Sequence, residues 1–371
     1  MNRTVLICGA SFAGLSTAYW MATFGYRVTV VELAPALKKG GTPVNIQDRT
    51  IDIVKRMGLL DQIREQALKM EVMEFKNAAD ITERSSVRPQ LTGNDAHDEY
   101  EIERDVLLEM LFDAVKDKVE FMFGDSIQSL NDETHQIAVS FKGGEQRSFD
   151  LVVGCDGVHS TVRRLCFGDE AQFLRYLGAY FSITIVDQSL IPDNTTQMYN
   201  EPGIAVMLNA YNQKTDICLC FQSEDEIPYD YRNEDEQRRI ITERFADVGW
   251  RTPELLAQVR RSDSFYFDKL CHTTMPSWTK GRIALVGDAA YCPSPAAGRG
   301  GSLAIDGAAA LADAFVACSG DFEQAFEQYN RSFRPFVEQI QAEVIEVGLD
   351  FFIPRTTEAI RARNAGTGPM V

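Results

Sequence analysis

Two periods of apolar positions alternate at the start of the chain. Residues 4–8 (TVLIC) form a continuous apolar run, which is typical of a buried strand, and Leu15, Ala18 and Ala22 then recur at helical spacing. A second β-branched run, residues 27–31, follows and leads into an acid. The pattern predicts a strand, a glycine-containing turn, a helix, a second strand and an acidic residue, in that order.

The turn between the first strand and the helix is formed by residues 9–14 (GASFAG). Gly9 permits a tight turn and Gly14 lets helix and strand pack closely, while the helix N-terminus offers N–H groups to a pyrophosphate. Glu32, 18 residues past Gly14, lies where a carboxylate can accept hydrogen bonds from the ribose of an adenosine. The middle position of this dinucleotide-binding fingerprint is Ser11 instead of glycine. The alternative, a glycine turn in an ordinary βαβ unit, stays open.

A Gly40-Gly41 pair follows within a polar loop. The pair would let the backbone approach a flat ligand closely because glycine adds no side chain. A solvated turn that carries Lys38 and Lys39 accounts for the same residues equally well, so both interpretations remain.

Helical and strand patterns alternate from there to residue 153. Apolar spacing predicts two helices and three strands, at residues 51–63 and 101–115 and at residues 119–123, 137–141 and 149–153. A polar stretch at residues 82–98 is typical of an exposed strand or loop. Arg104 falls near the start of the second helix, where a lone arginine is more often solvated or paired with an acid. Asp156-Gly157 follows the last strand at its carboxyl end, the edge at which open α/β sheets bind ligands.

Residues 174–277 are richer in β patterns, with one helical segment near residues 234–245. We expect a sheet-based domain here, inserted between two parts of the first domain, with a pocket for the substrate. Its aromatic and apolar residues suit a flat hydrophobic molecule but fit a sheet core better than a pocket wall. They are Tyr180, Phe181, Met198, Tyr199, Met207, Phe221, Tyr266 and Phe267.

The first domain then resumes with a buried run at residues 283–286, followed by Gly287-Asp288 and a proline-rich loop. Gly298, Gly300 and Gly301 lead into an Ala-rich helix, whose N-terminus can stabilise negative charge. From residue 321 the chain is mostly helical; Pro335 should kink or break this helix, and the chain should fray from about residue 362.

The predicted division follows from these shifts in pattern. Residues 1–173 and 278–320 would form a discontinuous cofactor-binding domain, with part of residues 70–100 on the substrate side. Residues 174–277 would form the substrate-binding sheet domain, and residues 321–371 a C-terminal helical segment.

Composition narrows the class of partner. The net charge is −17 and the pI about 4.8, which argues against nucleic acid or an anionic membrane surface. The eight cysteines include no CxxC pair, which favours a protein of the reducing cytoplasm. The four histidines form no HxxxH motif and no cluster with cysteines, so we assign no metal site. We expect no signal peptide, and we see no apolar run of about 18 residues for membrane insertion.

Three motifs in this order, the turn at residues 9–14 with Glu32, then Asp156-Gly157, then Gly287-Asp288, resemble the FAD-dependent aromatic hydroxylases of the para-hydroxybenzoate hydroxylase type. The resemblance spans nearly the whole chain. Within that group, LKKGG and SWTKGRIALVGDAAYCPSP look most like the tetracycline-inactivating flavin monooxygenases. The resemblance to the hydroxylase family implies an α/β fold: a Rossmann-like FAD-binding domain of the glutathione reductase type, an inserted β-sheet substrate domain and a C-terminal helix.

The resemblance also implies roles for particular residues. The turn would face the FAD pyrophosphate, Glu32 the adenosine ribose and Asp288 the ribityl chain, and the Asp156-Gly157 motif is associated with both FAD and NAD(P)H. The implied cofactor-binding residues are Gly9, Ser11, Phe12, Ala13, Gly14, Glu32, Gly40, Gly41, Arg104, Asp156, Gly157, Gly287, Asp288, Pro295, Gly298, Gly300 and Gly301.

The sequence departs from the family pattern at several positions. In the loop where the family usually has glycine-glutamine-glycine, this chain has Arg299 in the middle, and the asparagine that usually follows is replaced near Ser302. Tyr291 takes the place of the last residue of the common GDAAH motif. We hypothesise that Arg299 adds positive charge near the flavin; the alternative is that it points to solvent. Gln47 stands where some relatives carry an arginine near the flavin, which puts family-like NADPH handling in doubt.

The activity implied is a monooxygenase that uses tightly bound FAD, transient NAD(P)H and O₂. It would hydroxylate an electron-rich aromatic or polyketide substrate, such as a tetracycline, through a flavin C4a-hydroperoxide. We assign no catalytic side chain because the cofactor carries the chemistry. A reductase of the geranylgeranyl reductase type and a flavin-binding protein without turnover remain alternatives. Flavin halogenases are disfavoured by the lack of a WxW pair, and disulfide reductases by the single fingerprint.

Overall fold

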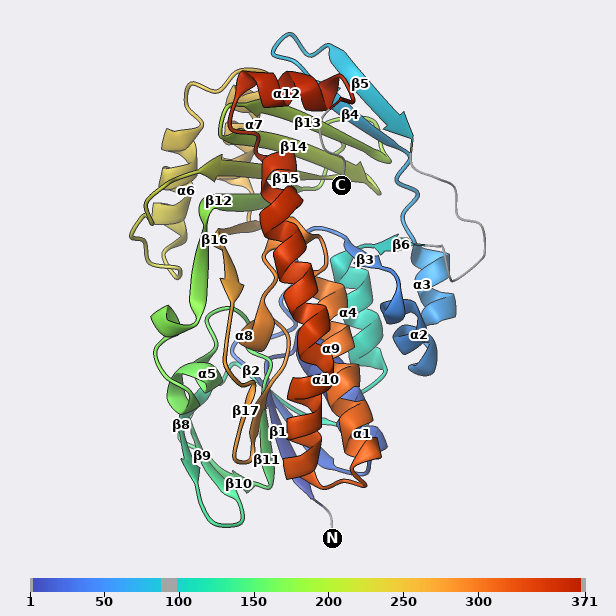
Figure 1. Ribbon diagram of the computed structural model, residues 1–371, viewed down its shortest axis with the longest axis vertical. Coiled ribbons are helices and arrows are strands. Elements are labelled where there is room, and N and C mark those ends of the chain that lie inside the picture. Colours follow the sequence, from blue (N-terminus) through green and yellow to red (C-terminus); the bar gives the residue numbers. More distant parts are fainter. Residues whose placement is uncertain (1–2, 88–98, 368–371) are drawn as a thin grey trace.

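A computed structural model describes residues 3–87 and 99–367. Figure 1 shows two bodies, one around β1, β2 and β11 and one around β12–β16, with helix α10 running along both. Of the stretch expected as a strand or loop, β5 covers Thr82–Val87, and residues 88–98 lie outside the described part.

The first body is built on a six-stranded sheet in the order β17-β18-β11-β1-β2-β7. All its neighbours pair in parallel except β17 with β18. The strands are β1 Thr4–Cys8, β2 Arg27–Glu32, β7 Glu120–Phe123, β11 Leu151–Gly154, β17 Thr279–Lys280 and β18 Ile283–Leu285. Every residue of β1 and β11 is buried, as continuous apolar runs require in a sheet covered on both faces.

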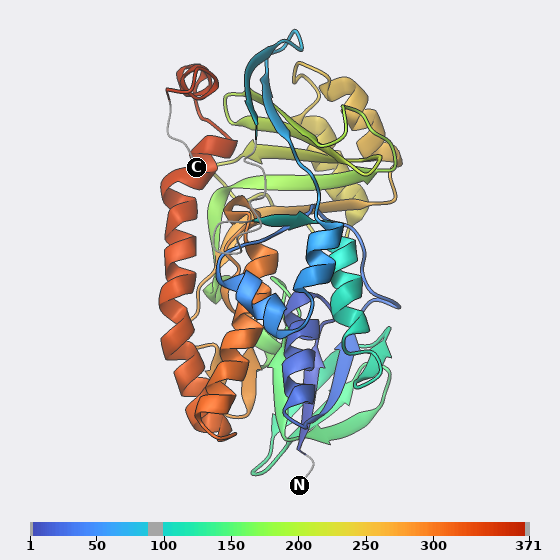
Figure 2. The ribbon, with the colours of Figure 1, turned by 90° about the vertical axis from the view of Figure 1, so that its right-hand side faces the viewer.

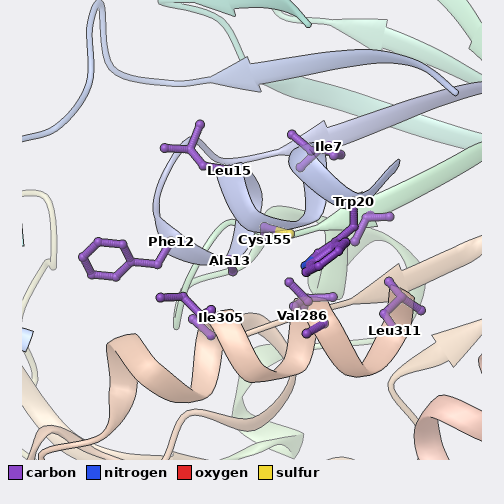
Figure 3. Close-up of a cluster of buried hydrophobic side chains, with 14 of the residues drawn as sticks. Ile7, Phe12, Ala13, Leu15, Trp20, Cys155, Val286, Ile305 and Leu311 are labelled. Carbon is purple, nitrogen blue, oxygen red and sulfur yellow. The ribbon is translucent and has the colours of Figure 1, made fainter. Parts of the chain in front are cut away.

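Helix α1 (Phe12–Thr23) lies between this sheet and helix α9 (Gly300–Ala317). Figure 3 shows Ala13 of α1 near Ile305 of α9, and Cys155, just past β11, beside Ala13. By length and composition helix α9 passes as a membrane span, but it contains two acids and most of its residues are buried inside the protein.

The remaining elements of the first body surround this layer. Residues 51–63 do not form one helix: α2 and α3 are separated at Gly58, whose φ is +74°. The elements are β3 Val44–Ile46, α2 Arg49–Arg56, α3 Leu60–Gln66, β6 Tyr100–Ile102, α4 Arg104–Asp113, β8 Ile127–Asp132, β9 Ile137–Phe141, β10 Gln146–Phe149, α5 Thr161–Cys166, α8 Asp288–Tyr291, and the short 3-10 helices Glu170–Gln172 and Pro295–Ala297.

The second body is a seven-stranded sheet in the order β16-β12-β15-β14-β13-β4-β5. Two of its strands, β4 and β5, come from residues before 100 and join it through the parallel pairing of β4 with β13. Side chains of helices α6 and α7 cluster with those of one face. The elements are β4 Val72–Lys76, β5 Thr82–Val87, β12 Leu174–Val186, β13 Thr195–Glu201, β14 Ile204–Tyr211, β15 Lys214–Gln222, α6 Glu234–Arg244, α7 Thr252–Arg261 and β16 Phe265–Thr273.

The C-terminal segment differs from the sequence expectation in two ways. Helix α10 (Phe322–Glu343) continues through Pro335, because packing of buried residues on either side, such as Phe333 and Val337, outweighs one lost hydrogen bond. The π-helix Val344–Gly348 and α11 (Leu349–Phe352) follow. The chain does not fray at residue 362 either, since α12 (Thr357–Asn364) buries Arg363 against β13; Figure 2 shows α12 beyond the end of α10.

Candidate functional site

The glycine-containing motifs meet at the N-terminus of α1. A Cβ atom on Gly9 would lie 2.4 Å from the carbonyl oxygen of Cys155, and one on Gly287 would lie 2.9 Å from the Cβ of Ala13. A Cβ on Gly301 would lie 2.6 Å from a methyl group of Val44. Segments far apart in the sequence therefore approach so closely that only glycine fits between them.

Glu32 lies beside the same turn. One oxygen of its carboxylate accepts a hydrogen bond from the Ala10 N–H at 2.8 Å, and the other accepts from the Ala34 N–H at 2.9 Å. Both bonds hold the carboxylate at the end of β2, next to the start of α1. Each oxygen keeps a lone pair for a further donor, such as a ribose hydroxyl.

Arg104 supplies positive charge at this helix terminus. Its guanidinium donates to the Ser11 hydroxyl at 3.3 Å and to the Lys38 carbonyl at 3.1 Å, and lies 5.2 Å from the centre of the Phe12 ring. Burial lowers the pKa of Arg104, and neighbouring Asp105 opposes this. The first turn of α1 carries no acid, so an anion here would meet a cation and helix N–H groups.

The Gly40-Gly41 loop packs directly against Arg104. A Cβ on Gly41 would lie 2.6 Å from the Arg104 Cδ, and the Gly40 N–H donates to Asp105 at 2.8 Å. Both glycines have positive φ angles, +97° and +110°. The loop also reaches the second body, because a Cβ on Gly40 would be 3.2 Å from the Ser264 hydroxyl.

The entry to α9 offers exposed backbone. Gly298 and Gly300 have no described atom within 4 Å of an added Cβ, and Pro295 begins the exposed turn before them. An added Cβ at Gly298 or Gly300 would therefore meet no described protein atom, unlike one at Gly301.

Asp156 has a structural part in this arrangement. Its carboxylate accepts hydrogen bonds from the Ser160 hydroxyl and from the N–H groups of Thr161 and Val162, at 2.7 and 3.1 Å for the latter two. It thereby caps α5 and fixes the loop from Gly157 onward. Burial raises the pKa of Asp156, and these bonds oppose that shift.

Asp288 and Tyr266 lie on two elements that contact each other, α8 of the first body and β16 of the second. Burial raises the pKa of Asp288 to about 6, against a hydrogen bond from Cys292. Tyr266 is 41% exposed, yet burial also raises its pKa, and its phenol is close enough to Asp288 and Arg104 for their charges to act on it.

Arg299 pairs with Asp48 instead of standing alone. Its guanidinium donates to the Asp48 carboxylate at 2.8 Å, so the neighbouring acid offsets its charge. Gln47, next to this acid, is partly buried. Tyr291 is fully buried, and its hydroxyl contacts that of Tyr329 at 2.9 Å, so this departure from the family pattern serves packing between α9 and α10.

The large sheet presents two different faces, since side chains alternate along each strand. The expectation of a sheet core holds for Tyr180, Tyr199, Phe221 and Phe267, which cluster with α6 and α7. The other face carries Phe181, clustered with Ala296 of the turn before α9, and partly buried Ile183 and Cys220. By alternation, Met198, Met207 and Tyr266 share this face. Met198 is fully buried there, where the Arg363 guanidinium lies 3.4 Å from its sulfur.

A cluster around His159 was not anticipated from the sequence. His159 lies in the loop after Asp156-Gly157 and contacts Glu170, 11 residues further on, and Asp268, 109 residues further on. The only local signal was a histidine two residues after that motif, because the contact with Asp268 depends on how the two bodies meet.

The residues present fit FAD. The close packing at Gly9 and Gly287 sets the tight turn before α1, the start of α1 with Arg104 suits a pyrophosphate, and Glu32 suits a ribose. The arrangement places a ligand across the carboxyl ends of β1, β2 and β11, at the edge where open α/β sheets bind them.

Comparison with known proteins agrees with this geometry. A family model described as FAD binding domain matches residues 2–344. An uncharacterised protein of Mycobacterium tuberculosis strain H37Rv is 36% identical over 343 residues, 91% of this chain and 92% of that protein. A flavin-dependent monooxygenase of Legionella longbeachae is 33% identical over 353 residues, covering 95% and 90% of the two chains.

Among solved structures, the crystal structure of the tetracycline destructase Tet(51) matches with a TM-score of 0.88 and 32% identity, over 99% of this chain and 96% of that one. The chain belongs to the FAD-binding family of flavin-dependent monooxygenases of the aromatic hydroxylase type. It is therefore a flavoprotein oxidoreductase, as the three motifs predicted.

Proposed function

We propose that the protein uses NAD(P)H and O₂ to hydroxylate a flat, electron-rich polycyclic substrate of the tetracycline class. The observation that carries the proposal is the second apolar face of the large sheet, which clusters with Ala296 of the turn before α9, next to the cofactor motifs. The likeness to Tet(51) over nearly the whole chain supports the same class of substrate.

Each site residue has a part in holding the cofactor. The N–H groups at the start of α1 and Arg104 would bind the pyrophosphate, Glu32 the adenosine ribose and Asp288 the ribityl hydroxyls. The open backbone at Gly298 and Gly300 would meet the flavin edge. Bound FAD supplies the redox and oxygen chemistry, and the protein orients it and keeps water out.

The sheet face suits an apolar ring system with some tolerance of shape. Ile183 and Cys220 are only partly buried. Met207 lies on the same face, because Cys218 pairs with Ile183 on one side and with Met207 on the other. Methionine adapts to irregular surfaces because its side chain is unbranched and polarisable. A planar polyketide would lie between this face and the flavin.

NAD(P)H would dock only transiently, since the chain carries one dinucleotide fingerprint and FAD would fill it. All eight cysteines are free thiols, which supports a reducing, cytoplasmic compartment.

The test is an absorbance spectrum of the purified protein, followed by NADPH or NADH oxidation with and without a tetracycline. We expect a yellow protein, drug-dependent consumption of NAD(P)H and oxygen, and loss of the drug's own absorbance. A yellow protein that is indifferent to tetracyclines and to other phenols under air would refute the proposal. Anaerobic reduction of an added substrate would favour a reductase, and tight drug binding without turnover a sequestering protein.

A further inference from the structure

The side chain of Gln341 joins the two bodies where they meet. Gln341 lies near the end of α10, the helix that runs along both bodies (Figure 1), and only 9% of it is exposed. Its amide nitrogen Nε2 donates to the carbonyl oxygens of Thr273 and Cys292, both at 3.0 Å. Thr273 is the last residue of β16 in the second body, and Cys292 directly follows α8 in the first. One amide thus holds one carbonyl from each body.

The same two residues also contact each other directly. The Thr273 N–H donates to the Cys292 carbonyl at 3.1 Å, and the Thr273 hydroxyl donates to the Asp288 carbonyl at 3.0 Å. Gln341 therefore closes a ring of hydrogen bonds around the point where β16 meets α8. Because buried carbonyl oxygens need donors, this ring fixes the distance between the two backbones.

A short, stiff loop leads from Cys292 to the start of α9. Pro293 and Pro295 each fix one backbone angle of this loop. The Ala296 carbonyl packs against the π-helix that continues α10, since a Cβ on Gly348 would lie 3.3 Å from the carbonyl oxygen. The C-terminal helical segment thus contacts the loop at two points, Cys292 and Ala296.

The loop ends at the backbone that the proposed function places at the flavin edge. Gly298 ends the loop and Gly300 begins α9, and neither has a described atom within 4 Å of an added Cβ. The N-terminus of a helix stabilises negative charge, and reduced flavin carries more negative charge than oxidised flavin. A displacement of the loop should therefore weaken the binding of reduced flavin more than that of oxidised flavin.

We propose that Gln341 is a positioning residue of the flavin site. It locks Cys292 to the end of β16 and so sets where the loop brings the N-terminus of α9 relative to the large sheet. The placement of the flavin edge at this terminus rests on the proposed function. The hydrogen bonds of Gln341 do not depend on it.

A charged contact joins the same two bodies elsewhere along β16. Nε2 of His159 lies 3.2 Å from the Asp268 carboxylate. Burial opposes the charge of His159, but hydrogen bonds to Asp268 and Glu170 raise its pKa to about 9. At pH 7 this contact is therefore charged, and it still joins the bodies when Gln341 is changed. Loss of the Gln341 amide should shift the loop without separating the bodies.

Asn330 provides a matched control on the same helix. Its Oδ1 accepts a hydrogen bond from the Trp278 N–H and its Nδ2 donates to the Thr279 hydroxyl, both at 2.8 Å. Asn330 therefore also ties α10 to the first body, but its partners belong to the edge strand β17 and the residue before it. Asn330→Leu and Gln341→Met each remove one amide at nearly constant shape. Only Gln341→Met releases the loop at Cys292.

The experiment measures FAD binding and the flavin reduction potential of each variant at pH 7, without any substrate. We expect Gln341→Met to weaken the binding of oxidised FAD about threefold and of reduced FAD about thirtyfold, within the range of two lost hydrogen bonds. The roughly tenfold difference lowers the two-electron potential by about 30 mV. Asn330→Leu should keep FAD affinity within about twofold of the wild type and leave the potential unchanged, while urea unfolding shows it to be destabilised like Gln341→Met.

An unchanged potential in Gln341→Met, or an equal lowering in Asn330→Leu, would overturn the proposal and leave Gln341 as a fastening of α10 alone. Gln341→Asn keeps the amide but withdraws it by one methylene group; it replaces Gln341→Met if the latter does not fold, with the potential again expected to fall. A protein that shows the expected potentials but hydroxylates no phenol would refute the proposed function and keep the role of Gln341.

Discussion

Replacing Gly9 by alanine tests whether the motifs converge as tightly as described. The added Cβ would lie 2.4 Å from the Cys155 carbonyl oxygen, whereas real Cβ contacts essentially never fall below 3.0 Å. The turn and the end of β11 must therefore separate by about 0.6 Å, the difference between these two distances. Gly9 also has a φ of +103°, which strains any residue that carries a side chain.

Gly25→Ala separates the two costs. Gly25 has a φ of +80°, but no described atom lies within 4 Å of its added Cβ, so only the backbone strain of about 1–2 kcal/mol applies. At Gly9 the steric displacement adds about 1–3 kcal/mol, as in overpacked cores. We expect Gly9→Ala to lower the free energy of unfolding by about 2–5 kcal/mol in total.

Urea unfolding of both variants, monitored by circular dichroism, measures this difference. FAD affinity, measured by quenching of flavin fluorescence, should fall in Gly9→Ala because the N–H groups of the turn move with it. Gly25→Ala should bind FAD like the wild type. If Gly9→Ala costs no more than Gly25→Ala and binds FAD normally, the close approach of the turn to Cys155 is refuted.

Three further outcomes are expected. Arg104→Met should weaken FAD binding by about 1.5–3 kcal/mol and reduce its salt dependence, since a charge-assisted contact is lost; an unchanged dissociation constant in titrations at two salt concentrations would contradict this. The folded-state pKa of His159 is raised to about 9, so its stabilisation should be complete below about pH 6.5 and disappear as the pH rises through 9; urea unfolding of His159→Gln and wild type should differ most near pH 6 and least above pH 9.5. Arg299→Gln and Asp48→Asn should shift the flavin reduction potential in opposite directions if the charge of this pair reaches the flavin, and potentiometric titration showing no shift in either would sink the hypothesis.

Much of the fold could be predicted because its signals are local. The strand, turn and helix from Thr4 onward follow from periodicity and from glycines whose conformation tolerates little else. The same holds for the strand before Gly287-Asp288 and for the β-rich middle of the chain. Where an element is set by residues that are neighbours in the sequence, the sequence is sufficient to predict that element.

Predictions failed where tertiary packing outweighed local preference. Pro335 does not end its helix, because buried neighbours hold it in place. Arg363 lies buried in a segment expected to fray, because its guanidinium bonds to Asn200 on the large sheet. Both cases depend on contacts with residues far away along the chain.

The site divides in the same way. The sequence by itself indicated the motifs at residues 9–14 with Glu32, at Asp156-Gly157 and at Gly287-Asp288, because each is a local pattern, and their family resemblance indicated the class of cofactor. Tertiary structure alone decided that Arg104 reaches Ser11, that Asp48 offsets Arg299, and that Asp268 meets His159. Such pairs are formed by the docking of one element on another, and local periodicity carries no information about which surfaces will meet.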